Sequence, residues 1–470
     1  MEGSIRGAVR LKRGFKGHCA ILIAQRRAPP RLTRESDLHG IFANGFGTDS
    51  EHCMSVERTL TSAPPVGPPK VGLVLPGGGA RAAYQVGVLR ALADLLPARA
   101  VNPFPVVTGT SAGAVNATAI AVHADRFRVA VGNLERVWRN FQVGQVFRAD
   151  TASMMRGSLH WLFAMLSGGW LLPPPKSLFD NSPLRELLKE QFDFTRIARS
   201  IADGHLDALA MSSAGYASSR SVSFFEAKPG CTPWQRTRRA GEPAHLSIDH
   251  LMASVAVPFL FPPVLLGEEY YGDGAMREAN PFSAAIHLGA QRLLVVGTRN
   301  EATQTLAVPP LCPTFGQIFG YMLDSLFTDG MYSDLERLTQ LNQIVDRVGP
   351  ISVNNPDGAV HLRRIDMLVI LPSRDLSEIA RHHVGSLPRT LRVLLRTMGA
   401  MNTGGGQLMS YLLFQESYTR ELIALGYQDA MKRADDLMSF LAGYSVASTG
   451  ATGILRRVDL RKEQRAEAQK

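Results

Sequence analysis

The chain has 470 residues, 45% of them hydrophobic and 20% charged, so it can bury a large core and is not a disordered polymer. Its formal net charge of +10 is concentrated near the two ends, because residues 71–450 hold 34 basic and 32 acidic side chains. This middle region lacks basic residues interleaved with aromatic ones, so we expect no nucleic-acid partner.

Four widely spaced cysteines show no zinc-binding pattern, and we expect neither a metal nor a cofactor. No apolar run reaches the roughly 18 residues of a membrane span. The short run 19–24 is followed by basic residues rather than a signal-peptide cleavage site. The sequence therefore predicts a cytoplasmic protein that contacts membranes only peripherally, and it leaves the oligomeric state open.

The chain begins with Arg-rich patches that show no helix or strand period. We interpret residues 1–53 as a disordered leader, and translation that begins at Met54 would omit it. The Pro-rich stretch 61–70 is interpreted as a stiff linker. The predicted organisation has three parts: a leader and linker over 1–69, a catalytic domain with a helical C-terminal extension over 70–445, and a basic disordered tail over 446–470.

From Val71 the pattern becomes that of an α/β protein. The apolar run 71–75 predicts a buried parallel strand, and a glycine turn and an amphipathic helix follow it. A second strand is predicted at 103–107 and a second helix at 112–122. Later strands are predicted at 206–214, 220–227, 292–298 and 365–371. We therefore expect a three-layer α/β/α fold with a mainly parallel sheet and helices on both faces.

Between the second strand and its helix stands the sequence GTSAG, in which Gly109 and Gly113 flank Ser111. This G-x-S-x-G pattern is typical of a sharp strand-to-helix turn that exposes a nucleophilic serine. An ordinary Gly/Ser turn is the alternative, but the flanking strand and helix favour the nucleophile.

Three consecutive glycines, Gly77, Gly78 and Gly79, follow the first strand. Their N–H groups suit a phosphate or an oxyanion. No G-K-[ST] follows, and Ala82 replaces the last glycine of a dinucleotide motif, so we favour an oxyanion hole beside Ser111. Arg81 is expected to steady this loop or add charge to it, unless it is a solvated helix residue.

A serine hydrolase needs a base, and histidine is the usual one. The histidines downstream of Ser111 on late elements are His287, His361, His382 and His383. Their local sequences favour structural or solvated roles. The turn GDGA offers a carboxylate instead, because Gly272 and Gly274 free the backbone around Asp273 at the end of a predicted strand. Taken alone, it could be an ordinary Asp-Gly turn.

Together, four motifs in this order resemble the patatin-like phospholipase family over roughly residues 70–300. The matched positions are Gly77, Gly78, Gly79 and Arg81 of the oxyanion loop, Gly109, Ser111 and Gly113 of the nucleophile elbow, Ala253, Ser254, Ala256, Pro258, Phe261 and Pro262 of a third motif, and Asp273, Gly274 and Ala275 of the aspartate motif. The resemblance implies a Ser–Asp dyad without histidine, and a lipid acyl hydrolase acting on phospholipid or another acyl ester. The alternatives are a soluble carboxylesterase or thioesterase, and a catalytically silent lipid-binding scaffold.

Two apolar stretches bear on the substrate. Residues 158–172 contain two tryptophans and no charge, which fits a membrane-facing lid or a buried helix pair equally well. Residues 316–338 predict an amphipathic helix. Its apolar face, with Phe319, Met322, Leu323, Leu326 and Phe327, is expected to pack in the core, although it could also line an acyl channel.

Overall fold

A computed structural model describes most of the chain between residues 69 and 444. The described residues are 69–148, 163, 167, 177–299, 312–355, 358–401 and 405–444. All of them belong to one compact unit, 57–470. Three predictions fall on residues outside the described ones: the leader, the tail and the stretch 158–172 apart from Phe163 and Ser167. They remain predictions.

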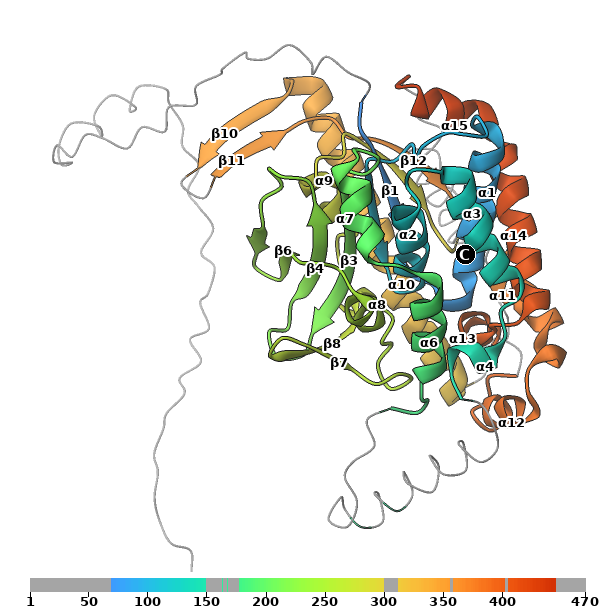
Figure 1. Ribbon diagram of the computed structural model, residues 1–470. Coiled ribbons are helices and arrows are strands. Elements are labelled where there is room, and N and C mark those ends of the chain that lie inside the picture. The colour runs from blue at the N-terminus through green and yellow to red at the C-terminus, as the bar shows by residue number, and fades with distance from the viewer. Residues whose placement is uncertain are drawn as a thin grey trace, which may run out of the picture. The chain divides into compact units, whose positions relative to one another are not determined.

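The core of the fold is a ten-stranded mixed sheet with the strand order β12-β9-β1-β2-β3-β4-β6-β5, in which β8 pairs with β3 and β7 (Figure 1). Five neighbouring strands, from β12 to β3, run parallel. The strands are β1 Val71–Leu75, β2 Val106–Thr110, β3 Ala208–Gly215, β4 Ser221–Ala227, β5 Trp234–Arg236, β6 Arg239–Pro243, β7 Val264–Leu266, β8 Glu269–Asp273, β9 Arg292–Val296 and β12 Asp366–Ile370. A separate hairpin joins β10 Ile351–Asn355 and β11 Gly358–Leu362.

Helices cover both faces of the sheet, as the sequence predicts. The helices are α1 Ala83–Leu95, α2 Ala112–Val122, α3 Phe127–Arg139, α4 Val143–Val146, α6 Ser182–Gln191, α7 Thr195–Ala202, α8 Ile248–Ser254, α9 Ser283–His287, α10 Phe315–Val348, α11 Leu376–His382, α12 Arg389–Thr397, α13 Gly406–Leu412, α14 Glu416–Met431 and α15 Ala434–Leu441. In β1, Leu73 and Leu75 face the core that includes α1, α2 and α14, whereas Val74 faces the core that includes α9 and α10. This alternation is the two-residue period of a strand buried on both sides.

One predicted strand is displaced. The expected strand 103–107 is replaced by β2, which begins at Val106. Pro103 and Pro105 have no N–H group to donate to a sheet ladder, so regular pairing starts only after them. The later start carries β2 directly to Ser111.

The C-terminal helices are part of the same layer structure. Helix α14 packs so tightly on α1 that a Cβ atom at Gly87 would lie 2.1 Å from Ile423 O. Gly426 makes the reciprocal approach, 2.1 Å from Tyr84 O. Helix α14 therefore completes the fold around the first strand–helix unit.

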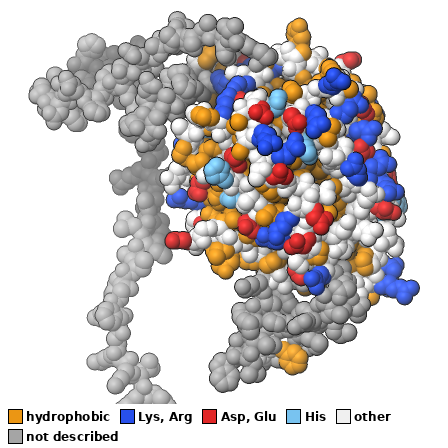
Figure 2. Space-filling view, viewed as in Figure 1, with side chains coloured by type: hydrophobic (Ala, Val, Ile, Leu, Met, Phe, Trp, Pro, Cys, Tyr) orange, Lys and Arg blue, Asp and Glu red, His pale blue; other side chains and the backbone are white. Residues whose placement is uncertain are grey.

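The described surface carries mixed charge. On the face that Figure 2 shows, Lys and Arg side chains alternate with Asp and Glu, and apolar side chains lie between them. Within the described residues, no helix combines the length and apolar character needed to cross a bilayer.

Candidate active site

Ser111 occupies a strained turn between β2 and α2. Its φ of 55° lies in the left-handed region, which is unusual for a residue with a side chain. A Cβ atom at Gly113 would lie 1.9 Å from Leu75 O, and one at Gly109 would lie 2.5 Å from Gly113 O. Both flanking glycines are therefore sterically required, which is the arrangement predicted from GTSAG.

The backbone of Ser111 is fixed by a residue whose contacts the sequence does not reveal. Ser111 N donates a hydrogen bond of 3.0 Å to Ser254 Oγ, which in turn donates one of 2.7 Å to Ser212 O. Ser254 is fully buried at the end of α8. Its only signal in the sequence was its place in the segment from Ala253 to Pro262.

Asp273 ends β8 and is only 1% exposed. Its Oδ1 accepts a hydrogen bond of 2.9 Å from Ala275 N, and Gly274 packs directly on Ser212 O. Its Oδ2 is buried and has no hydrogen-bond partner of regular geometry among the described residues. An oxygen left in that state is a strong acceptor for any proton that comes within reach.

Burial raises the pKa of Asp273 to about 7. Hydrogen bonding by the Ser111 side chain and by Ala275 N acts in the opposite direction and lowers this pKa, whereas the charge of Glu278 raises it. The Ser111 hydroxyl therefore lies close enough to Asp273 to favour its ionised form.

Glu278 is a second carboxyl group beside this pair, and no motif in the sequence indicates it. Its Oε2 accepts a hydrogen bond from the Thr110 hydroxyl, next to Ser111 in the chain. Burial raises the pKa of Glu278, while hydrogen bonds from Ser212 and Thr110 lower it. Glu278 thus ties the ends of β2 and β3 together behind the serine.

The glycine loop lies against Ser111, as predicted. A Cβ atom at Gly77 would be 3.1 Å from Ser111 Cβ and 2.5 Å from the Phe327 ring. Thr298 Oγ1 donates a hydrogen bond of 3.0 Å to Gly77 O. Among the described residues, the N–H groups of Gly77 and Gly78 have no acceptor. They are free donors beside the serine.

Arg81 is not a solvated helix residue, because it is 2% exposed. Its guanidinium forms a 3.0 Å ion pair with Asp324 and lies 4.0 Å over the Tyr411 ring. It also donates hydrogen bonds to Ser377 and Ser410. All these donors are directed at the C-terminal helices, so Arg81 steadies the loop rather than presenting its charge to Ser111.

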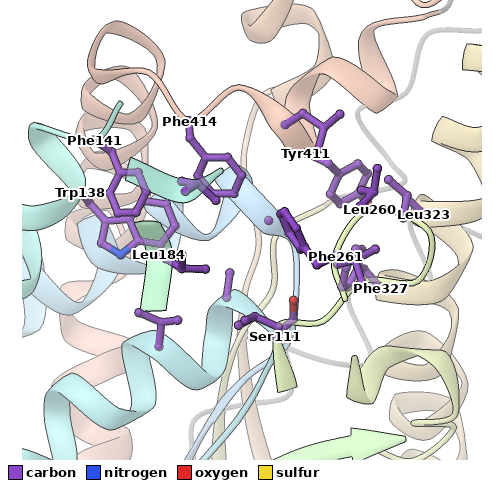
Figure 3. A pocket seen from close by; sticks show the side chains of 17 residues that line it. Ser111, Trp138, Phe141, Leu184, Leu260, Phe261, Leu323, Phe327, Tyr411 and Phe414 are labelled. Atoms are coloured by element: carbon purple, nitrogen blue, oxygen red, sulfur yellow. The ribbon is translucent and has the colours of Figure 1, made fainter. Parts of the chain in front are cut away.

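Ser111 lines an apolar cavity of about 60 Å³, and Figure 3 shows its hydroxyl oxygen directed toward Phe261. The other lining residues are Gly79, Ala112, Val115, Trp138, Phe141, Val146, Leu184, Val255, Val257, Leu260, Phe261, Leu323, Phe327, Tyr411, Leu412 and Phe414. The predicted helix of residues 316–338 lies within α10. Leu323 and Phe327 of this face are buried in the core, as predicted, and they also line the cavity, whereas Met322 is 47% exposed. The use of this face as an acyl channel stays a prediction.

Residues 73–286 match the model of the family described as Patatin-like phospholipase. The chain carries a patatin-like phospholipase domain. The match contains the glycine loop, the Ser111 elbow and the Asp273 turn. A search of curated proteins found no match.

Solved structures similar to this chain include VipD from Legionella pneumophila, with 13% sequence identity, coverage of 79% of this chain and 67% of that chain, and a TM-score of 0.33. They also include human GIVD cytosolic phospholipase A2, with 12% sequence identity, coverage of 80% of this chain and 60% of that chain, and a TM-score of 0.38. A third is the type III effector protein ExoU, with 14% sequence identity, coverage of 80% of this chain and 80% of that chain, and a TM-score of 0.24. The match thus covers less than two thirds of the human enzyme's own length.

The candidate histidines lie beyond the matched residues and have other surroundings. His287 stacks on Trp234 with 4.7 Å between ring centroids, and burial lowers the pKa of His287 to about 4. His383 pairs with Glu421 at 2.8 Å, and His382 is exposed at the end of α11. His361 belongs to β11. The surroundings of His287, His382 and His383 agree with the structural or solvated roles expected from the sequence, and the role of His361 stays a prediction.

Proposed function

We propose that the chain is a lipid acyl hydrolase of the phospholipase A or lysophospholipase type, with Ser111 as nucleophile and Asp273 as base. One observation carries this proposal. The Ser111 hydroxyl interacts with a buried carboxylate whose Oδ2 is unpartnered, and it also faces an apolar cavity. An acyl chain in that cavity would bring its ester carbonyl to the serine.

In the proposed first step, Asp273 takes the hydroxyl proton while Ser111 Oγ attacks the ester carbonyl carbon. The carbonyl π electrons move to oxygen and form a tetrahedral oxyanion. The free N–H groups of Gly77 and Gly78, together with the positive N-terminal end of α2, stabilise this charge.

When the intermediate collapses, the C–O bond to the leaving alcohol breaks, and the alcohol oxygen receives the proton from Asp273. Water then attacks the acyl-serine, again with Asp273 accepting the proton, and the fatty acid leaves as Ser111 Oγ recovers a proton. Neither half of the cycle uses a histidine.

A soluble short-chain ester or thioester is the second candidate substrate. Its supporting observation is the cavity volume of about 60 Å³, which is small beside the roughly 300–1,000 Å³ of common ligand pockets. A long acyl chain needs the apolar lining to separate, whereas a short acyl group does not.

The deciding experiment measures fatty acid released from mixed phospholipid vesicles without added calcium, and thiol or alcohol released from short-chain soluble esters. The proposal predicts vesicle hydrolysis by the wild type and none by Ser111→Ala. Hydrolysis of soluble esters alone favours the second candidate, and no hydrolysis of either substrate by folded protein rejects both.

The pH dependence of the rate follows from the raised pKa of Asp273. A base must be ionised to accept a proton, so kcat/KM should rise with pH, with a midpoint near 7, whereas an ordinary aspartate titrates near 4. Glu278 raises this pKa, so Glu278→Gln should move the midpoint to lower pH. Initial rates on a soluble ester, measured from about pH 5 to 9, check both statements. A flat profile would contradict the role of Asp273.

Exposed apolar side chains on the cavity-lining segments support contact with a lipid surface. Phe259 is 69% exposed and has a φ of 65°, yet its neighbours Val257, Leu260 and Phe261 line the cavity. The first turns of α10 also carry exposed apolar residues, including Tyr321 at 68%. A strained, exposed phenylalanine next to the cavity is well placed to insert among lipid chains.

We therefore expect Phe259→Asn to lower the rate on vesicles by about tenfold or more, since burying a phenylalanine contributes about 1.5–3 kcal/mol. Asparagine tolerates the left-handed backbone, so the fold should persist. The rate on a soluble ester should change by less than about twofold. Val101→Asn, at an exposed position outside the cavity lining, serves as the control. Equal loss on both substrates would show that Phe259 acts on catalysis instead.

A further inference from the structure

A second, much larger groove lies apart from the cavity at Ser111. Its volume is about 800 Å³, and three segments form its walls: the turn between β5 and β6, the chain that follows Asp273, and the middle of α10. The α10 backbone approaches the second segment closely, since a Cβ atom at Gly330 would lie 2.3 Å from Glu278 O. The groove is therefore a built feature of three packed elements.

Four arginines line this groove: Arg236, Arg238, Arg239 and Arg277. Among the described residues, none of them forms an ion pair within 4.0 Å. Arg239 Nη1 is shielded from solvent and has no hydrogen-bond partner there. Burial and then the charge of Arg337 lower the pKa of Arg239, Asp334 raises it, and the charge of Arg236 lowers it again, so Arg239 and Arg236 repel each other. A group of cations in this condition is stabilised by an anion.

The acidic groups nearby are already engaged. Asp334 accepts hydrogen bonds from Asn280 Nδ2 and Phe282 N, at 2.9 and 3.0 Å. Glu278 and Asp329 also line the groove, and they accept hydrogen bonds from Thr110 and Ser325. These acidic groups offset the arginines only in part: the charge of Asp334 raises the pKa of Arg239, but no acidic side chain of the described residues lies within 4.0 Å of the four arginines.

We propose that this groove binds an anion carrying at least two phosphate groups. Arginine forks bind phosphate oxygens through paired N–H donors, and the arginines come from two walls. The hydroxyls of Thr237, Ser325 and Ser333 also line the groove and supply further donors. The volume lies in the range of small-molecule sites. This site does not depend on the chemistry at Ser111.

Two sources could present such an anion, a soluble compound or a lipid headgroup. Calorimetric titration of the wild type with pyrophosphate in phosphate-free buffer tests the first source. Flotation of the Ser111→Ala protein with phosphatidylcholine vesicles containing phosphatidylinositol bisphosphate tests the second, with vesicles matched in charge by phosphatidylserine for comparison. Ser111→Ala prevents hydrolysis during the flotation.

The test variant is Arg236→Gln/Arg277→Gln, which removes one exposed arginine from each of two walls and should fold normally. Arg99→Gln/Arg199→Gln removes the same charge from exposed positions outside the groove and is the control. We expect the test variant to bind at least about tenfold more weakly, and the control to bind within about twofold of the parent protein.

Pyrophosphate binding with no preference for bisphosphate vesicles assigns a soluble ligand, and preference for those vesicles assigns a headgroup. The proposal is overturned if folded wild type binds neither probe. It is equally overturned if the two double variants lose binding to the same extent, because binding would then follow net charge alone.

Discussion

Asp273→Asn is expected to reduce ester hydrolysis by about 10⁴-fold or more, close to the loss caused by Ser111→Ala. Losing one member of a serine hydrolase's catalytic set typically costs about 10⁴ to 10⁶ in kcat. Here the carboxyl group has the proposed base role, and its buried Oδ2 has no hydrogen-bond partner of regular geometry among the described residues. Asparagine keeps the Ala275 contact but cannot accept the serine proton.

The same substitution should make the protein more stable at high pH. Because burial raises the pKa of Asp273 to about 7, ionising it costs more in the folded than in the unfolded protein. The cost is absent below about pH 4 and complete well above pH 7, where it reaches at most about 4 kcal/mol. Asp273→Asn removes this cost, so its advantage in the free energy of unfolding should grow from pH 5 to pH 9.

Denaturant unfolding at the two pH values measures this effect, and Asp203→Asn, at an exposed position on the surface, is the control. The opposite outcome, a folded variant with near-normal turnover, would remove Asp273 from the mechanism. A variant that is inactive but equally stable at every pH would contradict the raised pKa alone.

The substitution Arg81→Met is expected to lower the free energy of unfolding substantially. The buried guanidinium joins the glycine loop to Asp324 on α10, Ser377 on α11 and Ser410 on α13. Breaking a buried ion pair typically costs about 3–5 kcal/mol, because the remaining partner loses its compensation. Arg299 also pairs with Asp324, which places the expected loss at the lower end of that range.

Chemical denaturation measures this loss, and Arg420→Met breaks an exposed pair with Glu416 as a control that should cost less than about 1 kcal/mol. Arg81→Lys keeps the charge but not the fork of donors, so it should be intermediate. If Arg81→Met were as stable as the control, the loop would not depend on the C-terminal helices.

The parts of the site that were predictable from the sequence are those fixed by local backbone geometry. Gly109 and Gly113 must be glycine because the elbow leaves no room for Cβ, and Asp273 lies at a turn marked by its glycines. Strand ends were predictable to within a few residues, except where Pro103 and Pro105 delay β2.

The remaining parts depend on contacts between residues far apart in the chain. Ser254 reaches Ser111 across 143 positions, and Glu278 reaches Thr110 across 168. The partners of Arg81 lie between 243 and 330 positions away. No period or motif in one sequence encodes such pairings, so the role of the C-terminal helices around the glycine loop emerged only from the structure.

The most direct measurement is covalent labelling of the folded protein by a fluorophosphonate, followed by mass spectrometry of the intact chain and its peptides. The account predicts one adduct on Ser111 in the wild type, none in Ser111→Ala, and much slower labelling of Asp273→Asn. Absence of an adduct on folded wild type, or an adduct on a different serine, would contradict the claim that Ser111 and Asp273 form the catalytic pair.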